Sequence, residues 1–123
     1  MKNSAESIEE CLNHMDVDWI PFNDIYRSIF GFSNGEPTQS ELEETIQLIE
    51  LLLKEYNVIC LKGPEMKPFG DNTEDVIEKI RKMIRTEPYE SYYYGLWFDN
   101  LNQNKNSEGD CKRNCVKAIK LLT

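Results

Sequence analysis

The chain of 123 residues lacks two features that would direct it into or across a membrane. No apolar run reaches the roughly 18 residues that a membrane-spanning helix needs. The first seven residues, Met1 to Ser7, lack the apolar core of a secretory signal peptide. The sequence therefore predicts a cytoplasmic protein without a membrane partner. Its 40% hydrophobic and 11% aromatic residues are enough to bury one core, so we expect a single domain.

The sequence also lacks the motifs that carry enzyme chemistry. It has no Gly-rich phosphate loop, no nucleophile elbow and no spacing that pairs two carboxylates. His14 is the only histidine, and the spacing of Cys111 and Cys115 is one helical turn, not the C-x-x-C of zinc and redox sites. Together with Cys11 and Cys60, these cysteines are expected to be reduced thiols. We predict no enzyme activity, no metal and no cofactor.

Basic residues are scarce in the first half of the chain. Residues 1–50 contain 11 acidic residues and only two basic ones, Lys2 and Arg27, whereas residues 51–123 contain 11 acidic and 12 basic ones. Such an acidic half repels phosphate backbones and attracts a basic protein partner. The other interpretation is that the charge of −8 serves solubility alone.

The longest helical pattern covers residues 38–56. Its apolar side chains recur at steps of three and four residues: Leu42, Ile46, Ile49, Leu53 and Tyr56. Two capping boxes are possible at its start, Ser40 with Glu43 and, one turn earlier, Thr38 with Glu41. The opposite side of the helix is acidic, and we expect it to face solvent.

Turn residues separate the other periodic segments of the chain. We expect helices over residues 4–15, from Pro21 onward, and from Thr73 to Pro88, the last with Asp71 and Glu74 as its capping pair. Short strands are expected at residues 17–20 and 58–61, and a loop at 62–72. The predicted fold is mainly α (α+β), with a small two- or three-stranded sheet. The globular domain covers residues 1–100, a polar linker 101–110, and a basic helix or tail 111–123.

The segment from Tyr89 to Asn100 is the most aromatic one, and its composition predicts a strand. A strand sends Tyr93 to one face and Tyr92 and Tyr94 to the other, so at least one set is exposed. Exposed tyrosines are good interface anchors. The alternative is an aromatic strand that closes the core. In the preceding loop, Met66 and Phe69 either fold onto the core or remain available as contacts.

The order helix, strand, helix, turn, long helix, strand, loop is that of a winged helix-turn-helix, so the domain is expected to be winged-helix-like. In that arrangement the helix over residues 38–56 enters the DNA groove. Its exposed face, with five glutamates against one lysine, has the wrong sign for binding phosphates. A winged-helix transcriptional regulator is therefore the second functional hypothesis, and an acidic adaptor or structural module is the third.

A further resemblance runs over residues 16–100. It rests on Asp18-Trp19-Ile20-Pro21, on Ser40-Glu41 with Leu48-Ile49-Glu50-Leu51-Leu52, and on Arg85-Thr86-Glu87-Pro88 with Leu96-Trp97-Phe98. These landmarks resemble the small acidic bacterial immunity proteins of polymorphic and contact-dependent growth-inhibition toxin systems. The resemblance implies a protein that acts as a monomer or weak dimer and blocks a basic toxin, often a nuclease, by tight binding. Nucleic acid is not an expected partner. The candidate toxin contacts are Glu41, Glu43, Glu44, Gln47, Glu50, Met66, Phe69, Asp71, Tyr92, Tyr93 and Tyr94.

Overall fold

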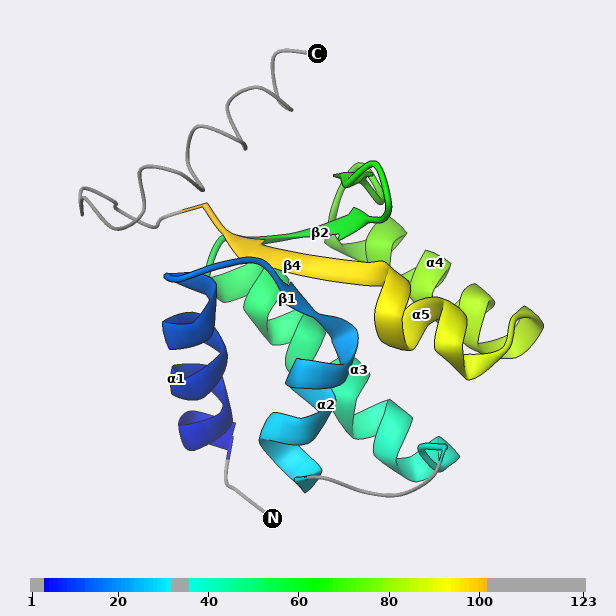
Figure 1. Ribbon diagram of the computed structural model, residues 1–123, viewed down its shortest axis with the longest axis horizontal. Helices are drawn as coiled ribbons and strands as arrows, with labels where there is room; N and C mark the ends of the chain where they lie inside the picture. The colour runs from blue at the N-terminus through cyan, green and yellow to red at the C-terminus, as the bar shows by residue number, and fades with distance from the viewer. Residues whose placement is uncertain (1–3, 32–35, 102–123) are drawn as a thin grey trace.

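The computed structural model describes residues 4–31 and 36–101 (Figure 1). Within these ranges it has five helices: α1 (Ser4–Met15), α2 (Phe22–Phe30), α3 (Gln39–Glu55), α4 (Thr73–Thr86) and α5 (Tyr89–Gly95). The same ranges contain four strands: β1 (Ile20–Pro21), β2 (Val58–Lys62), β3 (Lys67–Pro68) and β4 (Leu96–Asn100). The prediction of a mainly helical α+β fold is confirmed. The predicted linker after Leu101 and the basic tail lie outside the described residues.

The sheet has the strand order β1-β4-β2-β3, and all neighbouring strands are antiparallel. β2 and β4 form its centre and pair along their whole length, from Val58 opposite Asn100 to Lys62 opposite Leu96. β1 and β3 add two residues each at the edges. The sheet is thus one strand larger than predicted, because the expected loop turns back and pairs Lys67 and Pro68 with β2.

The core lies between one face of the sheet and the helices, with α2 at its centre. The α2 side chains Phe22, Ile25 and Tyr26 are at most 1% exposed. α1, α3 and α5 all pack against α2, and the sheet contributes the buried side chains of Cys60 and Phe98. Full burial of each such apolar side chain contributes about 1.5–3 kcal/mol. On β4, Leu96 and Phe98 face the helices and are buried, and Trp97 on the other face is only partly buried. Burial does not alternate strictly, because Asp99 on the Trp97 face is also buried.

The start of α3 uses the earlier of the two predicted capping boxes. Thr38 Oγ1 accepts a hydrogen bond from the backbone N–H of Glu41 at 3.1 Å, and Glu41 Oε1 accepts one from the backbone N–H of Thr38 at 2.9 Å. Ser40 lies inside the helix instead. At the other end, Asn57 takes a left-handed conformation, with φ of 56°, which is common just after a helix.

The start of α4 is capped one residue later than predicted. Asn72 is the N-cap, and its side-chain oxygen accepts a hydrogen bond from the backbone N–H of Asp75 at 2.8 Å. Asp71 and Glu74 therefore do not form the capping pair. Asp71 instead donates its backbone N–H to the Asp75 carboxylate at 2.9 Å. The sequence offers Asp and Asn side by side here, and both residue types are good caps, so sequence preference alone does not choose between them.

The predicted strand over the aromatic segment is wrong for its first half. Residues Tyr89–Gly95 form α5, and only Leu96–Asn100 form a strand, β4. On a helix, Tyr92 and Tyr93 both turn toward the core, where they meet Phe22 and Tyr26. A strand would have sent one of them to the opposite face. Packing on α2 therefore overrides the strand propensity of the tyrosines.

The winged-helix interpretation rested on the order of elements along the chain. That order holds from α1 to β3, although the first strand begins at Ile20 and not at residue 17. The central position beside β1 and β2, however, belongs to β4, which follows two further helices, α4 and α5. Figure 1 shows this strand crossing the middle of the molecule. The third strand in the sequence, β3, lies at the outer edge.

Candidate protein-interaction surface

The acidic face of α3 was predicted as a free surface, yet Glu41 is part of the fold. Its Oε1 atom accepts the capping bond from Thr38 and also a hydrogen bond from the Tyr26 hydroxyl at 2.8 Å. The donors at Thr38 and Tyr26 favour the charged carboxylate, so the pKa of Glu41 lies below its usual value. Glu41 thus links the start of α3 to the buried ring of α2, which leaves it poorly placed to serve a partner.

Glu43 is also engaged, by a basic residue of α4. Arg81 donates two hydrogen bonds to its carboxylate, at 2.6 Å and 3.1 Å. This guanidinium lowers the pKa of Glu43. The two side chains remain 39% and 45% exposed, so solvent limits the pair to about 1 kcal/mol or less. Further along α3, Glu50 pairs with Lys54 at 3.3 Å. Of the predicted acidic and polar contacts on α3, Glu44 and Gln47 are the exposed ones.

The tyrosine segment was predicted to provide interface anchors, and the structure divides its three consecutive tyrosines. Tyr92 is 2% exposed and Tyr93 6% exposed, whereas Tyr94 is 53% exposed. Tyr92 packs edge-on against Phe22, with ring centroids 5.3 Å apart. Burial raises the pKa of Tyr92 to about 12. Tyr92 and Tyr93 therefore belong to the core, and only Tyr94 is placed to touch another protein.

Tyr94 lies beside a second surface tyrosine and two carboxylates. Tyr89 precedes it in α5, and both rings contact Tyr93, at centroid distances of 5.6 Å and 5.1 Å. Glu90 follows Tyr89 in α5, and Glu36 comes from the segment before α3. Partial desolvation raises the pKa of Tyr89, and the negative charges of Glu90 and Glu36 act in the same direction. We call Tyr89, Tyr94, Glu36 and Glu90 the tyrosine patch.

The predicted contacts in the β2–β3 region have mixed placements. Phe69 is half-buried and packs against the core, and the Lys79 ammonium lies 6.0 Å from its ring centroid. Met66 occupies a left-handed turn position, with φ of 59°, and is half-buried. Asp71 is exposed at the rim of a cavity of about 270 Å³ between the end of α3, β2 and the start of α4. These residues are thus separate from the α3 face.

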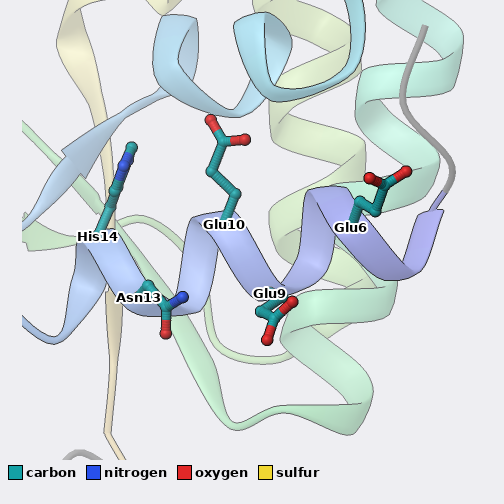
Figure 2. Close-up of a pocket in the computed structure, with 5 residues that line it drawn as sticks. All are labelled: Glu6, Glu9, Glu10, Asn13 and His14. Carbon is teal, nitrogen blue, oxygen red and sulfur yellow. The ribbon is translucent and has the colours of Figure 1, made fainter.

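A second acidic surface lies on α1, away from all the predicted contacts. Glu6, Glu9, Glu10, Asn13 and His14 line a depression of about 300 Å³. Figure 2 shows Glu10 and His14 on one side of the helix and Glu9 and Asn13 on another. All five residues belong to α1, so the depression is shaped by the side chains of one helix.

The sheet face that points away from the core carries Trp97. This residue pairs with Pro21 of β1 and Leu61 of β2 and lies on the opposite side of β4 from Phe98. Trp97 is half-buried there. It is the one landmark tryptophan within a strand, and it offers an apolar alternative to the tyrosine patch as a contact.

The described residues show little that suggests catalysis. Within residues 4–31 and 36–101, no group of three or more His, Cys, Asp and Glu side chains is arranged to hold a metal ion. Cys11 and Cys60 are buried free thiols, and burial raises the pKa of Cys60 well above its usual value. Cys111 and Cys115 lie outside the described residues. None of the described helices is long and apolar enough to cross a bilayer.

The protein is negatively charged, and the charge is unevenly distributed along the chain. It has 22 acidic and 14 basic residues, a net charge of −8, and residues 1–50 contain 11 acidic residues against two basic ones.

The comparison with known proteins gave no match to a protein-family model, to a curated protein or to a solved structure.

Proposed function

We propose that this protein is an immunity protein, which binds a cognate bacterial toxin domain and covers its active site. The observation that carries the proposal is the net charge of −8, with 11 acidic residues against two basic ones in residues 1–50. A surface with such an excess of carboxylates attracts a basic partner over distances of about 10 Å and speeds its association. Toxin domains that cleave nucleic acids carry basic surfaces, because they bind phosphates.

The sequence landmarks support the proposal at the level of the scaffold. The Asp18 to Pro21 stretch leads into β1, the Ser40 to Leu52 stretch forms most of α3, and the Leu96 to Phe98 stretch forms β4. These elements surround the core. The landmark residues thus belong to the elements that form the fold. The contacts with a toxin are made by residues on the surface of the domain.

The same charge argues against nucleic acid as the partner. Glu44 and Gln47 are exposed on α3, the helix that a winged-helix regulator would insert into DNA, and its basic neighbour Arg81 is already bound to Glu43. DNA affinity depends on neutralising phosphates, and the one lysine of α3, Lys54, pairs with Glu50. This supports a protein target over nucleic acid.

Co-expression with the toxin domain encoded next to this gene tests the proposal. We expect a stable complex on size-exclusion chromatography and growth of cells that the toxin alone would arrest. The matched control is a toxin domain from an unrelated system, which should neither bind nor be neutralised. Absence of both the complex and the rescue would overturn the proposal.

Charge reversal then tests the electrostatic mechanism. Glu44 and Glu55 are exposed on α3, whereas Glu41 and Glu43 hold the fold, so Glu44→Lys with Glu55→Lys is the informative double variant. We expect its association rate with the toxin to fall about tenfold at low salt and to depend less on salt. An association rate that is the same as that of the wild type at every salt concentration would show that the acidity serves only solubility.

A further inference from the structure

Two tyrosines of α5, the exposed Tyr94 and the half-buried Tyr89, rest on a buried aromatic base. The Tyr94 ring stands nearly perpendicular to that of Tyr93, at 84° and 5.1 Å, and Tyr89 meets the same ring at 65° and 5.6 Å. Tyr93 itself packs on Tyr26 at 5.8 Å. The two surface rings therefore lose little conformational freedom when a partner binds, which lowers the entropic cost of the contact.

The surroundings of these rings are negatively charged. Glu90 is exposed in α5, and Glu36 is exposed just before the cap of α3. Figure 1 shows that the start of α3, the end of α4 and the start of α5 gather at one end of the molecule. Between α4 and α5, Glu87 accepts a hydrogen bond from the Ser91 hydroxyl. Among the cations of the packed elements, Arg27 of α2 acts on the buried Tyr93, and Arg85 of α4 lines a groove of about 200 Å³.

We infer that the tyrosine patch binds arginine side chains on the surface of a basic partner protein. Aromatic faces attract cations, and carboxylates accept paired hydrogen bonds from a guanidinium. Arginine fits this combination better than lysine, because its planar group stacks on a ring while its edge reaches a carboxylate. The inference rests on the proposed function insofar as the arginines belong to a toxin domain.

This surface fits the role better than the acidic face of α3. Glu41 and Glu43 already have intramolecular partners, and Glu44 and Gln47 have no aromatic neighbour among the described ring contacts. Isolated surface charges steer association but contribute little once a complex has formed. Rings supported from below, together with exposed carboxylates on the same segments, supply both the steering and the desolvated contact.

Substitutions in the patch test the inference against the toxin domain. We expect Tyr94→Ala with Glu90→Gln to weaken binding at least tenfold, mainly through a faster dissociation rate. The matched control is Glu65→Gln, which removes an exposed charge in the β2–β3 turn and should change binding less than twofold. Because Tyr94 is exposed, the patch variant should keep the far-UV circular dichroism and melting temperature of the wild type. Binding within twofold of the wild type would overturn the inference while leaving the proposed function intact, and Trp97→Ala would then test the outer sheet face.

A second measurement separates the patch from the identity of the partner. A six-arginine peptide and a six-lysine peptide are titrated into the full-length protein while its amide and tyrosine NMR signals are recorded. We expect shifts concentrated at Tyr89, Glu90 and Tyr94, with several-fold tighter binding of the arginine peptide. Shifts spread evenly over all acidic surfaces, or equal binding of both peptides, would overturn the inference even if the toxin binds. The expected pattern in the absence of toxin binding would support the patch and count against the toxin as its partner.

Discussion

The Tyr26 hydroxyl offers the sharpest test of how the acidic helix is attached to the core. Its ring is buried at 1% exposure, and its oxygen lies 2.8 Å from Glu41 Oε1. Replacing Tyr26 by Phe keeps the ring contacts with Phe30 and Tyr93 and removes only the hydrogen bond. Because the acceptor is a carboxylate that is partly open to solvent, we expect a loss of about 1.5 kcal/mol in the free energy of unfolding.

The pH dependence of this loss follows from the lowered pKa of Glu41. A carboxyl group whose pKa is depressed by folding stabilises the protein above its unfolded pKa, and that stability is lost as the pH falls through the folded pKa. Tyr26→Phe removes one cause of the depression and leaves the Thr38 N–H in place. The difference between wild type and variant should therefore be constant above about pH 5 and shrink as the pH falls through the lowered folded pKa of Glu41, below which only a neutral hydrogen bond remains.

Urea unfolding followed by circular dichroism at pH 7 and pH 3.5 measures both effects. The expected loss at pH 7 corresponds to a melting temperature lower by about 5 °C. Tyr94→Phe is the matched control, since it removes a hydroxyl from an exposed ring and should change stability by less than about 0.5 kcal/mol. A loss for Tyr26→Phe no larger than that of the control, or one that is equal at the two pH values, would refute this account of Glu41.

Two further predictions concern the start of α3 and the cysteines. Thr38→Ala should lower the free energy of unfolding in urea by about 1 kcal/mol, because the capping box begins at Thr38. Ser40→Ala should have almost no effect. The reverse ranking would contradict this assignment. In a Cys111→Ser, Cys115→Ser background, the native protein should show no fast reaction with a thiol reagent at pH 8, and both remaining thiols should react after denaturation. Rapid reaction of the native protein would contradict the burial of Cys11 and Cys60.

Much of the fold follows from local sequence patterns. The helix over residues 4–15 was predicted with its observed bounds, and α3 was predicted within one residue at each end. These predictions succeed because an apolar residue every three or four positions is compatible with a helix and with little else. The left-handed Asn57 and the buried strand after it were likewise readable from residue type and composition.

The alternatives that the sequence left open, and the errors, occur where two local solutions are close in energy. Two capping boxes compete at the start of α3, and two adjacent side chains compete at the start of α4, where Asn72 is the cap instead of Asp71. The tyrosine segment has strand propensity, yet its first half is helical because α2 presents Phe22 and Tyr26 to it. A difference of less than about 1 kcal/mol in local preference is easily reversed by one packed aromatic pair.

The sequence by itself determined the helical periodicity, the acidic first half and the lack of a recognisable catalytic motif. Only the tertiary structure decided which acidic and aromatic side chains remain for a partner. It assigned Glu41 and Glu43 to Tyr26 and Arg81, buried Tyr92 and Tyr93, and left Tyr94 on the surface. The physical reason is that composition sets the total charge and apolar content, whereas the availability of each group depends on neighbours that are distant in the sequence. Tyr26 and Glu41 are 15 residues apart, and Glu43 and Arg81 are 38 residues apart.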